Sequence, residues 1–443
     1  MQREQGGTLR RRAGALVSPL AMRDFRRLWS ADMISLLGDW AGRLALTVLV
    51  LERTGSPAWA AAVTAVSLAG FVGIGQVLAT LADRFGRISV MLAADVARAG
   101  LFAAMLLELP VGMLLLLAFL AGLATPPFEA ARSAALPDLV PEERYGDSLA
   151  LAGISVQASI VVGNALGGVL LVLVGARGAL AINALSFLAS AVILLQLRTT
   201  PAAAPADADS SVGGSLRLAA SNLFGDRMVR RALAIISITG ALGTVDEALV
   251  VPYAAHIGLP NGYLGLLAAA VPVGTLIGTA VIARSSNHHT LLRSAGLCTA
   301  VTAAMAIPFF WFEVGGGGAF VAFVISGGMF AVSVPTNIVI GTRLHRGSRA
   351  SAMGIAVGVL MGSQALGAAV GGLAASAFGP PRAIVGALGI AAVFGAWSAV
   401  TTPVEAKHMA GRRRPARVEP TVVVDLVALE QDRAVPAGVA WTD

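Results

Sequence analysis

Long apolar runs alternate with short polar segments along almost the whole chain. Each run holds about 20 apolar residues, the number that an α-helix needs to cross the hydrocarbon layer of a membrane. A helix also satisfies its backbone hydrogen bonds internally, which lipid requires. The pattern predicts an all-α polytopic membrane protein with twelve spans, at residues 28–51, 57–81, 88–108, 111–133, 149–173, 176–197, 232–254, 261–283, 290–312, 317–341, 350–377 and 380–402.

A polar segment at residues 198–231 separates the first six spans from the last six. It contains TTPAAAPADADSSVGGS, a composition that cannot bury enough apolar surface to fold by itself. We therefore predict an N-terminal cytoplasmic segment (1–27), a six-helix bundle (28–197), a cytoplasmic linker, a second six-helix bundle (232–402) and a disordered cytoplasmic tail (403–443).

The two halves share a glycine pattern. The pair Gly167-Gly168 followed by Gly175 recurs as Gly371-Gly372 followed by Gly379, with an offset of 204 residues each time. With the arrangement of six spans, a linker and six spans, the repeat favours a duplicated bundle. In one transporter class such halves are related by an axis along the membrane normal.

The composition agrees with a lipid-facing surface and excludes several functions. The 443 residues are 56% hydrophobic and only 13% charged, whereas a soluble protein has about 25% charged residues. The single Cys298 excludes a disulfide within the chain. We find no Walker-type phosphate loop, no nucleophile motif and no histidine–carboxylate arrangement for a metal. We therefore expect no enzyme activity, no catalytic residue, no cofactor and no metal.

The basic residues predict the orientation. If the N-terminus is cytoplasmic, 27 of the 32 Lys and Arg residues fall on the cytoplasmic side, and only Arg53, Arg177 and Arg382 fall outside. This bias follows the positive-inside rule and accounts for the net charge of +7 without nucleic acid. Both termini should face the cytoplasm. The near absence of lysine and the abundance of Ala and Gly indicate a bacterial source, hence the bacterial plasma membrane.

Charged residues inside spans are costly and usually face a cavity or a partner. Asp39 and Arg43 lie four residues apart in the first span, so they share a helix face and can pair. They form either a proton-linked carboxylate controlled by a neighbouring arginine or a static pair that orients the helix.

The seventh span carries two adjacent acids, Asp246 and Glu247. Neighbouring helix positions point about 100° apart, so at most one acid faces a central cavity directly. They are candidates for proton or substrate binding, unless the ends of the span are misplaced.

Two more charged pairs lie near the predicted cytoplasmic side. Asp95 and Arg98, in the third span, are expected to join a network with Asp83 and with Arg84 or Arg87. This network is expected to be mainly structural.

Glu129 and Arg132 lie near the predicted cytoplasmic end of the fourth span. They either close a gate by pairing with other charges or are ordinary interface residues.

The stretch LADRFGRISVML (81–92) resembles the loop between the second and third helices of the major facilitator superfamily, G-x-x-x-D-R-x-G-R-R/K. Asp83, Arg84, Gly86 and Arg87 match, whereas Ala79 and Ile88 depart from the pattern.

Residues 25–56 and 126–151 resemble the branch of enterobactin exporters and macrolide-efflux-like proteins, as does GNALGG (163–168). Asn164 stands where many exporters have a proline.

This resemblance implies two bundles that rock about a central site lined by the first, fourth, seventh and tenth helices. It also implies that Asp83, Arg84, Gly86 and Arg87 latch the cytoplasmic ends in the outward-open state. Glycine at position 86 would permit a tight turn or close approach of the backbone.

Three functions remain open. The first is proton-driven export of a small, largely apolar molecule such as a drug, an antibiotic, a siderophore or another secondary metabolite. The second is an uptake carrier for a nutrient or lipid, and the third a non-transporting scaffold or sensor. For the first, the partners are a small-molecule substrate, protons and the lipid bilayer, with no nucleic acid, and we expect a monomer.

Overall fold

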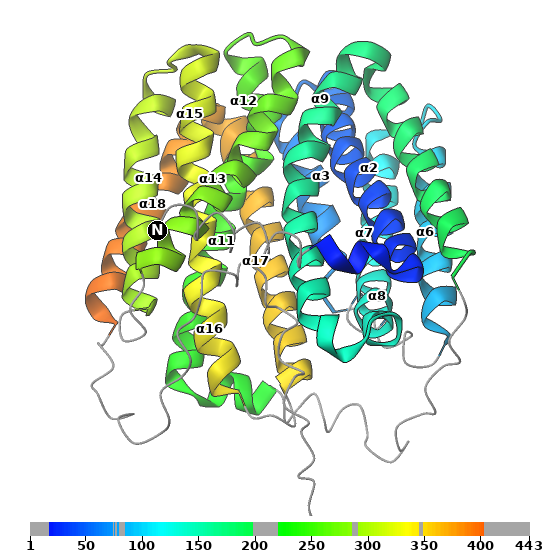
Figure 1. Cartoon of the computed structure of the whole chain (residues 1–443). Helices are drawn as coiled ribbons and strands as arrows, with labels where there is room; N and C mark the ends of the chain where they lie inside the picture. The colour runs from blue at the N-terminus through cyan, green and yellow to red at the C-terminus, as the bar shows by residue number, and fades with distance from the viewer. Residues whose placement is uncertain are drawn as a thin grey trace, which may run out of the picture.

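The computed structural model describes residues 17–73, 75, 78, 85–197, 220–285, 291–344 and 349–402. Every regular element in these residues is a helix, and most helices run along one long axis of the molecule (Figure 1). The α-helices are α2 (Arg23–Thr54), α3 (Pro57–Ala69), α6 (Arg87–Ala104), α7 (Val111–Leu123), α8 (Thr125–Leu139), α9 (Glu142–Leu194), α11 (Arg227–Ala248), α12 (Val250–His256), α13 (Leu264–Ser285), α14 (Leu291–Trp311), α15 (Gly315–Gly327), α16 (Ser333–Arg343), α17 (Arg349–Phe378) and α18 (Pro380–Thr401). Three short 3₁₀ helices are η1 (Ser18–Ala21), η2 (Asn261–Tyr263) and η3 (Gly328–Val332).

Within the described residues, nine helical segments are long and apolar enough to cross a membrane. One of them, α9, contains two predicted spans, joined at Gly175, whose φ of 70° interrupts the helix. The remaining two predicted spans correspond to α3, which is shorter, and to α6, which carries Asp95 and Arg98. The prediction of an all-α polytopic membrane protein is therefore confirmed.

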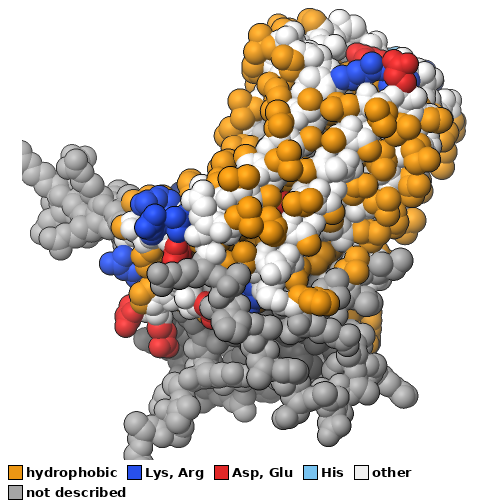
Figure 2. All heavy atoms as spheres, turned by 90° about the vertical axis from the view of Figure 1, so that its right-hand side faces the viewer, with side chains coloured by type: hydrophobic (Ala, Val, Ile, Leu, Met, Phe, Trp, Pro, Cys, Tyr) orange, Lys and Arg blue, Asp and Glu red, His pale blue; other side chains and the backbone are white. Residues whose placement is uncertain are grey.

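The outer surface has the distribution of side chains that a bilayer requires. In the face shown in Figure 2, hydrophobic side chains cover the middle of the molecule, and charged side chains gather near its two ends. Large apolar residues such as Leu173, Val393 and Val400 are more than two-thirds exposed. Because such exposure would be unusual in water, it marks a lipid-facing band.

Several helices extend beyond the predicted spans. The first begins at Arg23 rather than at residue 28, the fourth ends at Leu139 rather than at 133, and the seventh begins at Arg227 rather than at 232. Hydropathy detects only the segment in hydrocarbon, whereas a helix continues into the polar interface. The linker residues 198–219 and the tail residues 403–443 lie outside the described part of the chain.

The repeated glycines occupy equivalent places. Gly175 and Gly379 both have positive φ angles, of 70° and 86°, and each lies where one helix ends and the next begins. Side chains rarely adopt this conformation, so glycine suits both positions. The residues of the glycine repeat are therefore structurally equivalent in the two halves.

We call residues 17–197 the first half and residues 220–402 the second half. Helices of the first half (blue to green) and of the second half (green to orange) lie on opposite sides of Figure 1. The halves meet mainly through α3 against α17 and through α9 against α13. Most other close helix pairs, such as α2 with α9 and α14 with α18, lie within one half.

The repeat glycines lie at both junctions. A Cβ atom at Gly168 on α9 would lie 2.5 Å from the Cα of Gly265 on α13. A Cβ atom at Gly372 on α17 would lie 2.6 Å from the Cβ of Ala61 on α3. Positions 168 and 372 differ by the repeat offset of 204, and so do 61 and 265. The two junctions are therefore a symmetric pair, and both depend on small residues.

The two ends of the molecule differ in charge, and we give each a name. The basic end is the one where α8 and α16 finish and α11 begins. The opposite end is the one that carries Gly175 and Gly379. At the opposite end, the backbone N–H of Ala58 donates to the hydroxyl of Ser376 on α17 (3.0 Å). The glycine junctions therefore hold the halves together toward the opposite end.

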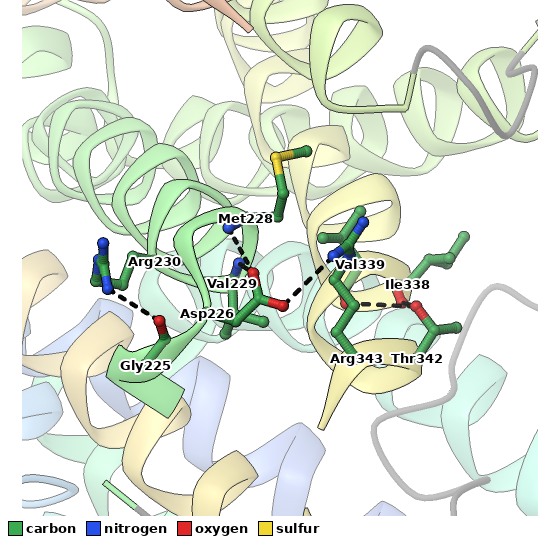
Figure 3. Close-up of polar contacts among 9 residues, drawn as sticks. All are labelled: Gly225, Asp226, Met228, Val229, Arg230, Ile338, Val339, Thr342 and Arg343. Carbon is green, nitrogen blue, oxygen red and sulfur yellow. Dashed lines mark hydrogen bonds and ion pairs between the residues drawn. The ribbon is translucent and has the colours of Figure 1, made fainter. Parts of the chain in front are cut away.

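An aspartate at the basic end starts the second half. Asp226 caps α11 by accepting hydrogen bonds from the backbone N–H groups of Met228 (2.6 Å) and Val229 (3.3 Å). Its other oxygen pairs with Arg343, the last residue of α16, at 3.4 Å (Figure 3). Partial burial acts to raise the pKa of Asp226, but these hydrogen bonds and Arg343 together place that pKa below its ordinary value.

Candidate functional site

Charged side chains inside the first half form three ion pairs. The predicted pair on α2 is present, with Arg43 Nη2 3.3 Å from Asp39 Oδ2. The Arg43 guanidinium also lies 4.5 Å from the centre of the Trp40 ring. The pair borders a cavity of about 20 Å³, also lined by Ser67 and Thr125, which is large enough for one water molecule.

The second pair includes a residue that sequence analysis missed. Arg132 on α8 lies 2.8 Å from Asp32 on α2, and Asp32 is almost completely buried. A signal was available, because Asp32 precedes Asp39 by seven residues and so lies on the same face of α2, two turns away. The sequence could not identify its partner, which is 100 residues later in the chain.

The third pair is the most completely buried of the three. Arg98 is 2.5 Å from Asp95, its neighbour on α6, and Ser190 on α9 donates a hydrogen bond of 2.6 Å to the same carboxylate. The Arg98 guanidinium lies between two aromatic rings, 4.7 Å from the centre of Phe128 and 4.5 Å from that of Phe187. These contacts stabilise a buried cation by hydrogen bonding and cation–π attraction.

Of the partners that were expected for Asp95 and Arg98, only Arg87 is among the described residues. Arg87 forms an ion pair with Asp138, near the end of α8. Among the described residues, no hydrogen bond or ion pair joins Arg87 to Asp95 or Arg98. Two of the predicted partners, Asp83 and Arg84, lie outside the described residues.

The backbone at Gly86 has a φ of −56°, which is accessible to any residue. Among the described residues, an added Cβ would meet only the Ser89 hydroxyl, at 3.5 Å. Because the preceding residues 79–84 lie outside the described part of the chain, the tight turn or close approach expected at Gly86 stays a prediction.

Glu129 is the fourth acidic residue inside the first half, and none of the three arginines there forms an ion pair with it. It was expected near the end of the fourth span, but α8 continues to Leu139, ten residues beyond it. At 1.5 Å per residue, Glu129 lies about 15 Å from that helix end. Arg132 was assigned to the cytoplasmic side, but it pairs with the buried Asp32.

The side chain of Glu129 is exposed, yet charges on three helices act on it, among them Arg132, Asp32 and Arg98. Among the described residues it has no hydrogen bond and no ion pair. Because a carboxylate facing lipid would be very costly, and because charges on α2 and α6 act on it, Glu129 faces the inside of the first half.

The two acids of α11 differ in their surroundings. Asp246 is only 1% exposed, and its Oδ1 accepts a hydrogen bond from the backbone N–H of Glu247 (2.8 Å). Its Oδ2 is buried without a hydrogen-bond partner, and the nearby Ser326 hydroxyl donates instead to the carbonyl of Phe323. Glu247 is partly exposed, and Arg43 of the first half acts on it electrostatically.

A family model with the description Major Facilitator Superfamily matches residues 28–357, which is most of the chain. The chain belongs to the Major Facilitator Superfamily. It is thus a multi-pass membrane transporter of small molecules and not an enzyme, as the sequence predicts.

Known members of this superfamily resemble the chain over different lengths. An uncharacterized MFS-type transporter of Bacillus subtilis, YfiS, is 26% identical over 71% of this chain and 78% of its own length. Macrolide efflux protein A of Streptococcus pyogenes is 32% identical, but over only 27% of this chain and 31% of that protein.

Solved structures of the superfamily share the fold. A bacterial homolog of the human lysosomal transporter Spinster, in an inward-facing and unoccupied conformation, has a TM-score of 0.70 and 16% identity, covering 85% of this chain and 98% of its own. The nucleoside transporter NupG has a TM-score of 0.66 and 14% identity, covering 86% of this chain and all of its own. At these identities the likeness concerns the fold alone.

Proposed function

We propose that this transporter is a proton-coupled exporter of small, largely apolar compounds, such as drugs, antibiotics, siderophores or other secondary metabolites. It works by alternating access, with the basic end in the cytoplasm. Similarity to macrolide efflux protein A supports export, although it covers only 31% of that protein. The latch predicted at Asp83, Arg84, Gly86 and Arg87 belongs to this proposal.

One observation carries the proton coupling. Asp246 is buried with an unpartnered carboxylate oxygen, and the described interior of the second half contains no basic side chain to neutralise it. An isolated buried carboxylate is so costly that such a group binds a proton instead. Asp246 lies in the last turn of α11, beside the break at Leu249, where a helix movement would open it to water.

Asp39 and Glu247 are further candidates for the proton. Asp39 already has Arg43 as a counter-charge, at 3.3 Å. Asp246 has no such partner and is the stronger candidate.

The halves are joined toward the opposite end by the glycine junctions. If the basic end faces the cytoplasm, this arrangement is inward-open. Alternating access then requires the junctions at Gly168 and Gly372 to separate while the cytoplasmic ends close.

Transport into everted vesicles tests the proposal. In vesicles with an acidic interior, accumulation of radiolabelled erythromycin or another apolar antibiotic from a panel is expected, and a protonophore should abolish it. Asp246→Asn should lose the accumulation driven by the pH gradient but retain exchange of substrate across the membrane. Accumulation only in right-side-out vesicles would instead indicate an uptake carrier. If Asp246→Asn keeps proton-coupled transport and Asp39→Asn loses it, Asp39 rather than Asp246 carries the proton.

A further inference from the structure

The interior of the first half contains one carboxylate more than it has arginines. Its acids are Asp32, Asp39, Asp95 and Glu129, and its bases are Arg43, Arg98 and Arg132. Each arginine lies within 3.3 Å of a different aspartate. The three pairs neutralise one another, so the remaining charge of the group belongs to Glu129.

Arg132 does not neutralise Glu129. The two residues lie one turn apart on α8, but the guanidinium is directed to Asp32 at 2.8 Å. The Nε atom of Arg132 is buried and has no hydrogen-bond partner. Arg132 therefore acts on Glu129 only as a nearby charge.

The described interior of the second half does not offset this charge. It adds the acids Asp246 and Glu247, of which Asp246 is neutral while it holds the proton proposed above, and no basic residue, since its arginines lie near the helix ends. Arg43, which acts on Glu247, is already paired with Asp39. An interior whose unpaired charges are all acidic attracts cations and repels anions.

Apart from these charged groups, the helix around Glu129 is mostly apolar. It reads TPPFEAARSAAL, and Phe128 and Ala131 are buried. A ligand that satisfies both features has an apolar body and a positive charge. Siderophores that bind iron through anionic oxygens do not fit this description, although they are among the compounds considered for export.

We infer that Glu129 is a substrate-binding residue that holds the cationic group of a lipophilic amine or similar organic cation. The inference rests on the proposed transport function and narrows its substrate class. The carboxylate is exposed on α8, ten residues before the end of that helix. A cationic group can reach it there and replace water as its partner.

Binding of two ions of nearly equal size and opposite charge tests the inference. Tetraphenylphosphonium and tetraphenylborate would be measured by equilibrium dialysis against the purified, detergent-solubilised protein, with protein-free micelles subtracted. The native protein should bind the cation at least tenfold more tightly than the anion. Glu129→Gln, which keeps the shape of the side chain, should weaken binding of the cation about tenfold.

Glu52→Gln is the matched control, because Glu52 is an exposed glutamate near the end of α2, away from the interior. It should leave both affinities unchanged. Equal affinity of the native protein for the two ions would overturn the inference, and so would unchanged cation binding by a folded Glu129→Gln protein. The comparison of the two ions on the native protein requires no variant, so it decides the question even if Glu129→Gln does not fold.

This measurement is made at equilibrium without a proton gradient. Its failure would remove the cationic substrate class but leave proton-coupled export standing. Failure of export in vesicles would leave the binding result unchanged.

Discussion

At the scale of single residues, the interior is organised by counter-charges. Asp95 is completely buried and is stabilised by Arg98 and Ser190. Two buried charges gain little net stability over apolar residues of similar size, but removing one of them leaves the other uncompensated. The structural role of this pair can therefore be separated from transport.

Arg98→Met should lower the free energy of unfolding by about 3–5 kcal/mol, because it leaves the Asp95 carboxylate without a cation. Adding Asp95→Asn should restore most of the loss, since the amide is neutral and can still accept from Ser190. Thermal unfolding in detergent, followed by fluorescence, measures both variants. If the single and the double variant are equally destabilised, the uncompensated charge of Asp95 is not the cause of the loss.

At the scale of helices, the glycine junctions decide how closely the halves approach. Gly168 and Gly265 bring the backbones of α9 and α13 together, and Gly372 does the same for α17 against α3. A single methyl group at Gly168 would overlap the facing backbone, which has no side chain that could move away. The helices would have to separate.

Gly168→Ala should weaken the contact between α9 and α13 at the opposite end. A Cβ added at Gly262 would lie 3.6 Å from Cγ2 of Val172 across this junction. Cysteines at these two positions should therefore form a disulfide readily in a Cys298→Ser background. The yield should fall several-fold in Gly168→Ala. Gly100→Ala is the control, because Gly100 lies within α6 and no atom approaches its added Cβ. Equal disulfide yields in Gly168→Ala and Gly100→Ala would contradict the role of Gly168 in the contact between α9 and α13.

Asp226 acts at the same scale by capping α11 and pairing with α16. Asp226→Ala should lower the free energy of unfolding by about 1 kcal/mol, the usual value for an N-cap, whereas Asp226→Asn should cost less because asparagine also caps helices well.

The pH dependence of this pair has a definite sign. Because the folded-state pKa of Asp226 lies below its ordinary value of 3.8, its charge stabilises the fold above that pH. The stabilisation is lost as the pH falls through the lower folded-state pKa. The difference in melting temperature between the native protein and Asp226→Asn should therefore shrink below pH 3.8. A difference that is constant from pH 7 to pH 3 would exclude the ionised carboxylate as its cause.

At the scale of the whole molecule, the charge distribution implies an orientation. Arg87, Arg230 and Arg343 are at the basic end. The positive-inside rule predicts that this end is cytoplasmic. The linker and the tail are predicted on the same side. The glycine junctions would then close the molecule toward the outside.

Labelling with a membrane-impermeant maleimide tests this orientation in a Cys298→Ser background. A cysteine at Glu108, which is 83% exposed at the opposite end, should be labelled in intact cells. A cysteine at Glu143, exposed at the start of α9, should be labelled only after the membrane is permeabilised. The reverse pattern would invert the predicted topology.

Sequence reasoning was most successful for features that depend only on the spacing of residues along the chain. It predicted the spans, the Asp39–Arg43 pair and the repeat that includes Gly175 and Gly379, because each depends on spacing along the chain. It was weaker at helix ends, where α8 continues to Leu139 through polar residues.

The sequence by itself determined the all-α membrane fold, because the thickness of the bilayer and the need to satisfy backbone hydrogen bonds leave few alternatives. Only the tertiary structure decided which interior charges are neutralised. Arg132 pairs with Asp32 from 100 residues away, and Ser190 reaches Asp95 from another helix. Such partners depend on helix rotation and packing, which no spacing along the chain specifies. That choice of partners leaves Glu129 unpaired and makes it a candidate for binding substrate.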